Sequence, residues 1–427
     1  MLTPQEMRET LDVFAKRPSP FSDFRRELQS TLLSAMHVVS YQPGDYLIRQ
    51  GDAGEDLLVI LEGTATGHVR QAVGPSTPIA EFSAGAVVGE ISLLTKEPRT
   101  ADVVASSAVR ALSLPVVDFH RLAEEHPELR VVLTYVLAER LGRSSYDGLS
   151  GKDIHGYRIH RTVGRGGMGI VYEGASLATG ETVALKMMNH ALLYQPAAVK
   201  RFRREAEALR SFQHPSIARL YDHFAAYQTE FLVMEFCEGS TLDQRMASHG
   251  PFPEALVRSI VGQLAETLHY VHQLGRTHND LKPSNVIIGP SGRAKLLDFG
   301  LARFGQRGGN DDATTVSQAI GPVGTLRYMA PEQFSNDPTD YRVDVYGLAC
   351  VAYELLTGRP VVSASDVFGI IQEKRAFVLP KAAEIGSGIT PEMYVFLARG
   401  LEAHPEKRTV DLHRLGEWAR PIEWPVD

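Results

Sequence analysis

The side chains best suited to chemistry lie in the stretch "GRTHNDLKPSNVII" and in "LLDFGLA" shortly after it. The first contains Asp280, Lys282 and Asn285, and the second contains Asp298. A carboxylate such as Asp280 can orient a substrate hydroxyl and accept its proton, and a lysine can stabilise a transferring phosphoryl group. Asparagine and aspartate oxygens are suitable ligands for Mg²⁺. The spacing therefore indicates phosphoryl transfer to a hydroxyl, assisted by magnesium.

A glycine-rich stretch upstream, "VGRGGMGIVYEG", has a pattern that suits phosphate binding. Gly164, Gly166 and Gly169 fit G-x-G-x-x-G, and Val171 follows. Glycine lets the backbone approach a triphosphate closely and present its N–H groups to it. Dinucleotide-binding folds share the pattern, so alone it is a weak signal. Here it lies between strand-like segments rather than before a helix, which favours binding of the ATP phosphates.

Lys186 lies in the apolar stretch "TVALKMM" and needs an explanation. An unpaired ammonium group in a buried strand is costly, so we expect a carboxylate partner. The stretch "VKRFRREAEAL" offers Glu205, which we prefer, and Glu207 as the second choice. The alternative is a surface lysine whose ammonium group reaches water.

In this order, the motifs resemble the Hanks-type Ser/Thr protein kinase family over about residues 154–420. "GRGGMGIVY" and "RFRREAEAL" are most similar to bacterial members, and "DLKPSN" resembles the Ser/Thr class. The resemblance implies a bilobal kinase fold, ATP and Mg²⁺ as cofactors, and protein substrates. It implies catalysis by Asp280 and Lys282, magnesium binding by Asn285 and Asp298, and nucleotide binding by Gly164, Gly166, Gly169, Val171, Ala184, Lys186, Glu205, Glu235 and Cys237.

The same resemblance implies supporting roles. Met234 would be the gatekeeper before an adenine hinge at residues 235–237, while Asp344 and Arg408 would be scaffold residues of the helical lobe. A catalytically inactive member is the alternative. Such members usually lack the glycines, the lysine, the catalytic base or the metal-binding aspartate, and all are present here.

The catalytic motif departs from the family at Asn279, where most kinases have arginine. That arginine pairs with a phosphate on the activation loop and orders it. Asn279 carries no charge, so we expect activity not to depend strongly on loop phosphorylation. The alternative is that Arg303 or Arg327 takes the place of the arginine. The hydroxyls open to modification are Thr314, Thr315 and Ser317.

A second group of candidate residues lies in "GAVVGEISLLTKEPRTADV", where Glu90 and Arg99 flank a short apolar turn. The simplest alternative is a surface salt bridge. However, "YQPGDYLIRQGDAGEDLLVILEG" precedes the stretch, and residues 20–141 as a whole resemble a cyclic nucleotide-binding domain. "GEISLL" would form a one-turn helix whose amides face an anion. Arg99 would bind the cyclic phosphate and Glu90 the ribose 2′-hydroxyl.

The resemblance implies a pocket in which Thr100, next to the arginine, slightly favours cGMP over cAMP. Hydroxyl residues there also occur in bacterial relatives that bind cAMP, so both nucleotides stay open. The implied pocket consists of Gly89, Glu90, Ile91, Ser92, Arg99 and Thr100.

Length, composition and charge indicate what kind of protein carries these motifs. A chain of 427 residues with 44% hydrophobic and 22% charged residues suggests a soluble protein of two or three domains. The net charge of −7 argues against nucleic acid as a partner. Cys237 and Cys350 form no metal or disulfide pattern, and we expect neither a signal peptide nor a membrane segment. A cytoplasmic location is the simplest expectation.

The predicted fold class is α+β multidomain, with a β-roll or jelly-roll domain and flanking helices followed by a bilobal kinase fold. The predicted domains are residues 1–141, a Gly- and Ser-rich linker at 142–153, and the kinase at 154–427. We expect the N-terminal domain to inhibit the kinase until a cyclic nucleotide binds. The linker region has two basic residues followed by two serines, namely Arg140, Arg143, Ser144 and Ser145. The simplest interpretation of this pattern is a solvated linker.

Two alternatives remain at this point. One is a kinase whose N-terminal domain docks a protein and binds no nucleotide, and the other is a scaffold of two non-catalytic domains. The sequence leaves the physiological substrates and the oligomeric state open.

Overall fold

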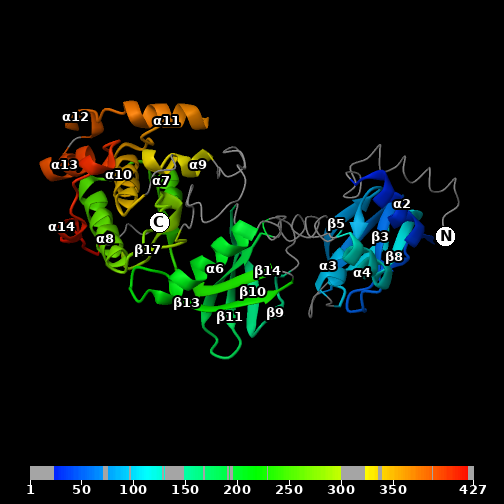
Figure 1. Ribbon diagram of the computed structural model, residues 1–427. Coiled ribbons are helices and arrows are strands. Elements are labelled where there is room, and N and C mark those ends of the chain that lie inside the picture. The colour runs from blue at the N-terminus through cyan, green and yellow to red at the C-terminus, as the bar shows by residue number, and fades with distance from the viewer. Residues whose placement is uncertain are drawn as a thin grey trace. The chain divides into compact units, whose positions relative to one another are not determined.

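A computed structural model describes the chain over the ranges 24–70, 76–95, 98–126, 129, 149–166, 169–189, 192, 196–227, 229–299, 323–334, 339–386 and 388–421 (Figure 1). The chain divides into two compact units, residues 1–196 with 224–231 and residues 197–223 with 232–427. One buried cluster around Leu58 lies in the first unit, and another around Leu326 lies in the second.

The N-terminal domain is built from two four-stranded antiparallel sheets, with strand orders β1-β8-β3-β6 and β2-β7-β4-β5. Leu58 and Ile60 of one sheet share a core with Ala65 and Val103 of the other. This arrangement confirms the predicted β-roll. The strands are β1 (His37–Tyr41), β2 (Tyr46–Ile48), β3 (Asp56–Glu62), β4 (Thr64–Val69), β5 (Thr77–Ser83), β6 (Val87–Val88), β7 (Asp102–Ala105) and β8 (Val109–Pro115).

Among the described residues, three helices accompany these sheets: α2 (Arg26–Ala35), α3 (Glu90–Thr95) and α4 (Val116–Glu125). Helix α2 buries Leu28, Leu32 and Leu33, which recur at the spacing of one helix face. The short helix predicted for "GEISLL" is α3. The predicted helix in "PELRVVLTYVLAERL" and the linker arginines and serines lie outside the described residues.

A six-stranded sheet with the order β13-β14-β12-β11-β10-β9 carries the glycine-rich stretch and Lys186. Strand β10 pairs with β9 and with β11, and β11 pairs with β12, in each case antiparallel. The aromatic ring of Phe224 stacks on those of Tyr157 and Phe231. The strands are β9 (Asp153–Ile154), β10 (Tyr157–Gly166), β11 (Gly169–Ser176), β12 (Thr182–Met188), β13 (Leu220–Ala226) and β14 (Thr229–Glu235).

The second unit is mostly helical, as predicted for the C-terminal part. Helix α10 (Arg342–Thr357) is buried around most of its circumference, which explains why its sequence is apolar rather than amphipathic. The other elements are α6 (Pro196–Ser211), β15 (Ser240–Thr241), α7 (Leu242–His249), α8 (Glu254–Gln273), η2 (Pro283–Asn285), β16 (Val286–Ile288), β17 (Ala294–Leu296), α9 (Val323–Leu326), η4 (Pro331–Phe334), α11 (Val367–Ala376), α12 (Ala382–Ile385), α13 (Pro391–Gly400), η5 (Pro405–Lys407) and α14 (Leu412–Gly416).

No helix within the described ranges combines the length and the apolar character that crossing a membrane requires.

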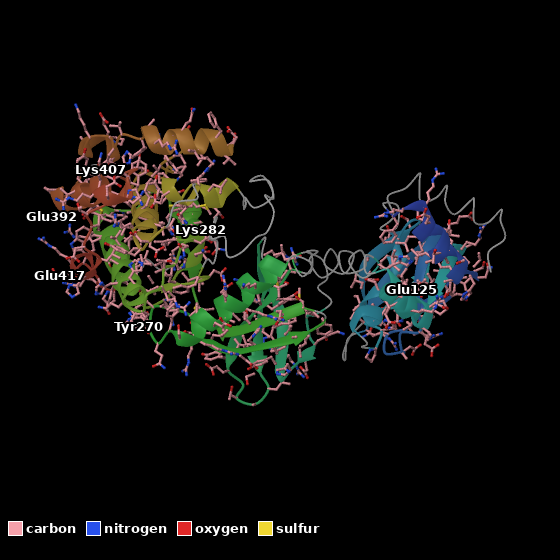
Figure 2. The ribbon with its side chains drawn as sticks, in the orientation of Figure 1. Glu125, Tyr270, Lys282, Glu392, Lys407 and Glu417 are labelled. Carbon is pink, nitrogen blue, oxygen red and sulfur yellow. The ribbon has the colours of Figure 1, made fainter. Side chains whose placement is uncertain are left out.

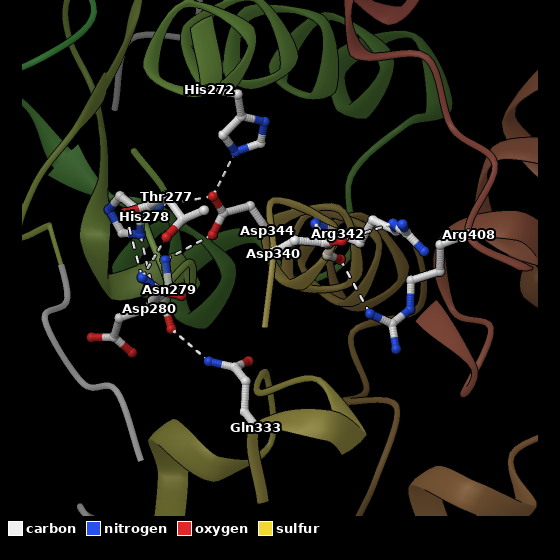
Figure 3. A network of polar contacts seen from close by, with 10 residues as sticks. All are labelled: His272, Thr277, His278, Asn279, Asp280, Gln333, Asp340, Arg342, Asp344 and Arg408. Carbon is white, nitrogen blue, oxygen red and sulfur yellow. Dashed lines mark hydrogen bonds and ion pairs between the residues drawn. The ribbon is translucent and has the colours of Figure 1, made fainter. Parts of the chain in front are cut away.

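A buried ion pair joins η4 to the segment before α14. The side chains of Arg408 and Glu332 are 0% and 8% exposed, and the two guanidinium nitrogens lie 2.5 and 2.7 Å from the two carboxylate oxygens. Arg408 Nε also donates to the carbonyl of Glu402. Breaking such a buried pair by removing one partner typically destabilises a protein by about 3–5 kcal/mol. The position of Arg408, visible in Figure 3, suits the scaffold role expected from the sequence.

Candidate active site and nucleotide pocket

The described structure brings the two predicted catalytic residues, Asp280 and Lys282, together with the predicted magnesium ligand Asn285. Asp280 Oδ2 accepts hydrogen bonds from Lys282 Nζ at 2.8 Å and from Asn285 Nδ2 at 3.1 Å. Asn285 Nδ2 also donates to the backbone carbonyl of Asp280 at 2.8 Å. Oδ1 of Asp280 makes no hydrogen bond to any described residue, so a substrate hydroxyl could reach it. Lys282 is also labelled in Figure 2.

The backbone of this loop is held by the Asp344 carboxylate, which lies buried in the first turn of α10 (Figure 3). Its oxygens accept the backbone N–H groups of His278 at 2.8 Å and Asn279 at 2.7 Å. His272 Nε2 lies 2.7 Å from the same carboxylate. Because the carboxylate contacts two consecutive N–H groups, the direction of the chain entering Asp280 is set before any substrate binds.

The buried ring of His278 links the catalytic loop to the strand end that precedes Asp298. Its Nδ1 lies 3.3 Å from the backbone N–H of Asp280, and its Nε2 lies 3.1 Å from the carbonyl of Leu297. An amide N–H can only donate and a carbonyl can only accept, so Nδ1 is the acceptor and Nε2 carries the proton. The ring therefore joins the two segments that carry the predicted catalytic and metal-binding side chains.

Thr325 is a site residue that the sequence did not single out. Its Oγ1 lies 3.1 Å from Lys282 Nζ, so one ammonium group contacts both Asp280 and the threonine hydroxyl. The stretch "GTLRYMAPEQ" marks the end of the activation segment, but no local pattern indicates a contact with a residue so distant in sequence.

Asn279 adopts a left-handed backbone conformation, with φ of 66°. Asparagine tolerates this conformation better than most residues. Its Nδ2 donates to Thr277 Oγ1 at 2.7 Å, and its carbonyl accepts a hydrogen bond from Gln333 Nε2 at 3.2 Å. Gln333 Oε1 in turn accepts the backbone N–H of Ala330 at 2.7 Å. Neutral hydrogen bonds thus connect the catalytic loop to η4.

The described residues show neither Arg303 nor Arg327 in the role of the arginine that Asn279 replaces. Arg303 and the three candidate hydroxyls of the activation loop lie outside them. The backbone carbonyl of Arg327 accepts a hydrogen bond from the buried Lys374. Burial raises the pKa of Glu354, and the hydrogen bond from Tyr328 and the Arg327 charge act in the opposite direction.

The two predicted magnesium ligands lie on segments joined by a backbone hydrogen bond. The N–H of Leu297 donates to the carbonyl of Asn285 at 2.8 Å, and Asp298 follows with a left-handed φ of 46°. Both hydrogen bonds that the Asn285 side chain makes to described residues use Nδ2, so Oδ1, the atom that would bind magnesium, accepts none from them. The donor set fits Mg²⁺.

No cluster of three or more His, Cys, Asp or Glu side chains that could hold a metal occurs in the parts of the chain that the structure describes. The pair formed by Asn285 and Asp298 does not require one. Mg²⁺ usually takes one or two protein ligands and completes its shell with waters and phosphate oxygens.

The glycine-rich stretch and Lys186 are brought into register by three neighbouring strands. Val171 pairs with Gly164 on one side and with Lys186 on the other, and Ala184 lies farther along the same strand. A Cβ atom at Gly169 would lie 1.9 Å from the Met187 carbonyl oxygen. At Gly164 and Gly166 an added Cβ would meet no such obstacle among the described atoms. Packing thus requires glycine only at Gly169. The close approach of a phosphate to the backbone remains a reason for glycine at Gly164 and Gly166.

Burial distinguishes between the alternatives for Lys186 and its carboxylate. Lys186 and Glu205 are each 4% exposed, whereas Glu207 lies on the exposed face of α6. The alternative of a surface lysine is therefore wrong. Since a buried carboxylate must be compensated, Glu205 is favoured over Glu207, and its pairing with Lys186 stays a prediction.

The predicted adenine hinge begins where β14 ends. Met234 is buried, and the backbone N–H of Glu235 donates to the Arg219 carbonyl at 2.8 Å. The Glu235 carboxylate pairs with Lys295 at 2.5 Å, so contact with adenine would fall to backbone atoms. Burial raises the pKa of Cys237 to about 11, which keeps the thiol neutral.

In the N-terminal domain the predicted pocket residues gather around the turn between β6 and α3. Gly89 has φ of 95°, and a Cβ atom there would lie 2.3 Å from Arg99 Nη1, so only glycine fits. Arg99 Nη1 donates to the Gly89 carbonyl at 2.9 Å and lies 3.4 Å from Ser92 Oγ. Glu90, Ser92 and Arg99 are buried, while Ile91 and Thr100 are half-buried.

Asp56 is a residue of this pocket that the sequence did not indicate. Arg99 Nη2 donates to the Asp56 carbonyl at 2.6 Å and to its carboxylate at 2.8 Å. Asp56 opens an apolar strand, and nothing local in its sequence suggests contact with an arginine beyond the next three strands.

The fold and these sites define the class of protein. The chain belongs to the protein kinase family, because the model of the protein kinase domain matches residues 157–414. The model of the cyclic nucleotide-binding domain matches residues 38–126. Both the resemblance seen in the motifs and the predicted fold class are thereby confirmed.

Curated relatives are bacterial Ser/Thr-protein kinases. PknH of Mycobacterium tuberculosis is 36% identical over 255 residues, covering 59% of this chain and 39% of that protein. PknB of Mycobacterium leprae is 34% identical over 257 residues, covering 59% and 40%. PknE of Mycobacterium tuberculosis is 35% identical over 257 residues, covering 60% and 44%. The chain thus spans about two fifths of the length of the relatives it matches.

The glycine geometry leads to an expected difference between two alanine variants. Gly169→Ala places a Cβ atom against the Met187 carbonyl and should loosen the β11–β12 ladder, whereas Gly166→Ala adds its methyl group to open space. Hydrogen exchange of the β12 amides should accelerate at least about tenfold in Gly169→Ala, equivalent to about 1.4 kcal/mol of opening free energy. Equal protection in the two variants would contradict this packing.

Proposed function

We propose that the protein is a Ser/Thr kinase that transfers the γ-phosphate of ATP to protein hydroxyls. The observation that carries this proposal is the Asp280 carboxylate held between Lys282 and Asn285 on a loop fixed by Asp344. Oδ1 of Asp280 would accept the hydrogen bond of the substrate hydroxyl and orient it for attack. Lys282, held also by Thr325, would stabilise the charge of the transferring phosphoryl group.

The remaining kinase residues would bind and position ATP. Gly164, Gly166, Gly169 and Val171 would cover the phosphates, and Lys186 with Glu205 would hold them. Ala184 and the backbone at residues 235–237 would bind the adenine. Asn285 and Asp298 would hold Mg²⁺, which when bound neutralises charge on the phosphates.

Replacement of the carboxylate that orients the hydroxyl tests the catalytic assignment. Asp280→Asn should lower phosphoryl transfer by about 10²–10⁴-fold, because the amide cannot accept the proton, while ATP affinity stays close to that of the native protein. Asp243→Asn changes an exposed aspartate in the same unit and is the matched control. Transfer of ³²P to a generic protein substrate measures the effect. Near-normal turnover of Asp280→Asn would rule out the assigned role.

We further propose that loop phosphorylation is not the main control. Asn279 carries no charge and cannot form an ion pair with a phosphate, and its side chain already bonds to Thr277. The link from Asn279 through Gln333 to Ala330 connects the catalytic loop to the end of the activation segment through uncharged groups.

The N-terminal domain is the proposed regulator. We propose that residues 1–141 restrain the kinase, residues 154–427, through the linker at 142–153, and that cyclic nucleotide relieves this restraint. Gly89, Glu90, Ile91, Ser92, Arg99 and Thr100 would bind the nucleotide, with cGMP slightly favoured over cAMP. The match to a cyclic nucleotide-binding domain supports this proposal. A nucleotide can shift the equilibrium only by its differential affinity for the two states.

Regulation is tested by kinase activity of the intact chain with and without cGMP or cAMP. We expect at least about tenfold activation, which requires about 1.4 kcal/mol of coupling free energy. Arg99→Ala should blunt the response, and residues 150–427 alone should be active without nucleotide. An intact chain that ignores both nucleotides, together with an inactive fragment, would refute autoinhibition. Binding of neither nucleotide would favour a docking module, and absence of ATP turnover would favour a scaffold.

A further inference from the structure

The guanidinium group of Arg99 is already occupied by acceptors of its own domain. Arginine has five N–H donors. Both hydrogens of Nη1 face the Gly89 carbonyl and Ser92 Oγ, and both hydrogens of Nη2 face Asp56, so among contacts to described residues only Nε–H is left over. Arginine usually binds a phosphate through two parallel N–H groups. A cyclic phosphate therefore cannot obtain that contact without taking the place of a present acceptor.

The sheet geometry explains why Asp56 became that acceptor. Leu58 pairs with Val88 in the ladder between β3 and β6, and the same register would place residue 90 opposite Asp56. The chain instead turns at Gly89 into α3, so the ladder stops before it reaches Asp56. Arg99 Nη2 takes the Asp56 carbonyl, and this brings the Asp56 carboxylate within 2.8 Å of the same nitrogen.

The Asp56 carboxylate is held from its other side as well. Ser113 Oγ on β8 donates to Asp56 Oδ2 at 2.9 Å while Oδ1 contacts Arg99. The side chain is 33% exposed, whereas that of Arg99 is 5% exposed. The carboxylate is thus the more solvent-exposed member of the pair.

The charges around Arg99 favour exchange over simple addition of a ligand. Burial lowers the pKa of Arg99, and the carboxylates of Asp56, Glu90 and Asp52 act in the opposite direction. One guanidinium is therefore close to three carboxylates. A cyclic phosphodiester brings a further negative charge, so its binding becomes favourable chiefly where it displaces one of them.

We propose that Asp56 is an internal competitor for the phosphate of the nucleotide and so sets the affinity of the pocket. Without ligand, the Asp56 carboxylate pairs with Arg99. When a cyclic nucleotide binds, its phosphate takes the Arg99 N–H groups and the Asp56 side chain moves to solvent. This inference rests on the proposed nucleotide binding, and it predicts that the native affinity is weakened by the free energy needed to open the pair.

Calorimetric titration of the full chain with cAMP and with cGMP tests this competition. Asp56→Asn keeps the shape of the side chain and removes its charge. We expect it to bind at least one nucleotide about tenfold more tightly than the native chain. Asp52→Asn is the matched control, because Asp52 is exposed and its carboxylate makes no hydrogen bond to Arg99 within the described set. It should change the affinity by less than about threefold.

The outcomes separate this inference from the proposed function. If the native chain binds nucleotide and Asp56→Asn binds equally or more weakly, Asp56 only positions Arg99, and the competition is refuted while nucleotide binding stands. An equal gain of nucleotide affinity in Asp56→Asn and Asp52→Asn would refute it as well, since the gain would then come from the lower negative charge around the pocket in general. Binding by Asp56→Asn alone would support the competition and refute nucleotide control of the native chain. Binding by neither protein would refute both.

Discussion

The buried carboxylate of Asp344 is the contact on which the catalytic loop depends. Two consecutive backbone N–H groups, those of His278 and Asn279, have this carboxylate as their acceptor. Leaving one such buried donor without a partner would cost about 1–3 kcal/mol. The contact fixes where Asp280 leaves the backbone, and the bonds of Asp280 to Lys282 and Asn285 follow from that position.

Further contacts extend from this anchor in two directions. His278 joins the loop to Leu297, and the backbone of Leu297 joins Asn285, so the two candidate magnesium ligands share one support. In the other direction, Gln333 connects the carbonyl of Asn279 to Ala330. None of these bonds uses a phosphate or an arginine, which is the physical basis for the proposed independence from loop phosphorylation. Control would then rest with the N-terminal domain, where Arg99 and Asp56 already form a pair.

Local signals in the sequence predict elements and neighbouring side chains, while the catalytic roles stay predictions. The catalytic spacing from Asp280 to Asn285 holds within a single loop, and the apolar residues of α2 recur along one helix face. The strand β3 was predicted from its run of apolar residues, and it is buried on both sides. The same kind of reasoning could not find Asp56, Thr325 or Gln333. Each acts through a contact with a segment distant in sequence, and such contacts become visible only in the fold.

Activity of the intact protein in which Thr314, Thr315 and Ser317 are all changed to alanine tests most directly whether the catalytic loop is held without loop phosphorylation. The variant and the native protein, the latter also after phosphatase treatment, would be assayed for initial rates of ³²P transfer at saturating ATP. A loop held by Asp344 and neutral hydrogen bonds predicts rates within about threefold of the native rate. Loss of activity by a factor of 100 or more, about 2.7 kcal/mol in the barrier, would contradict it.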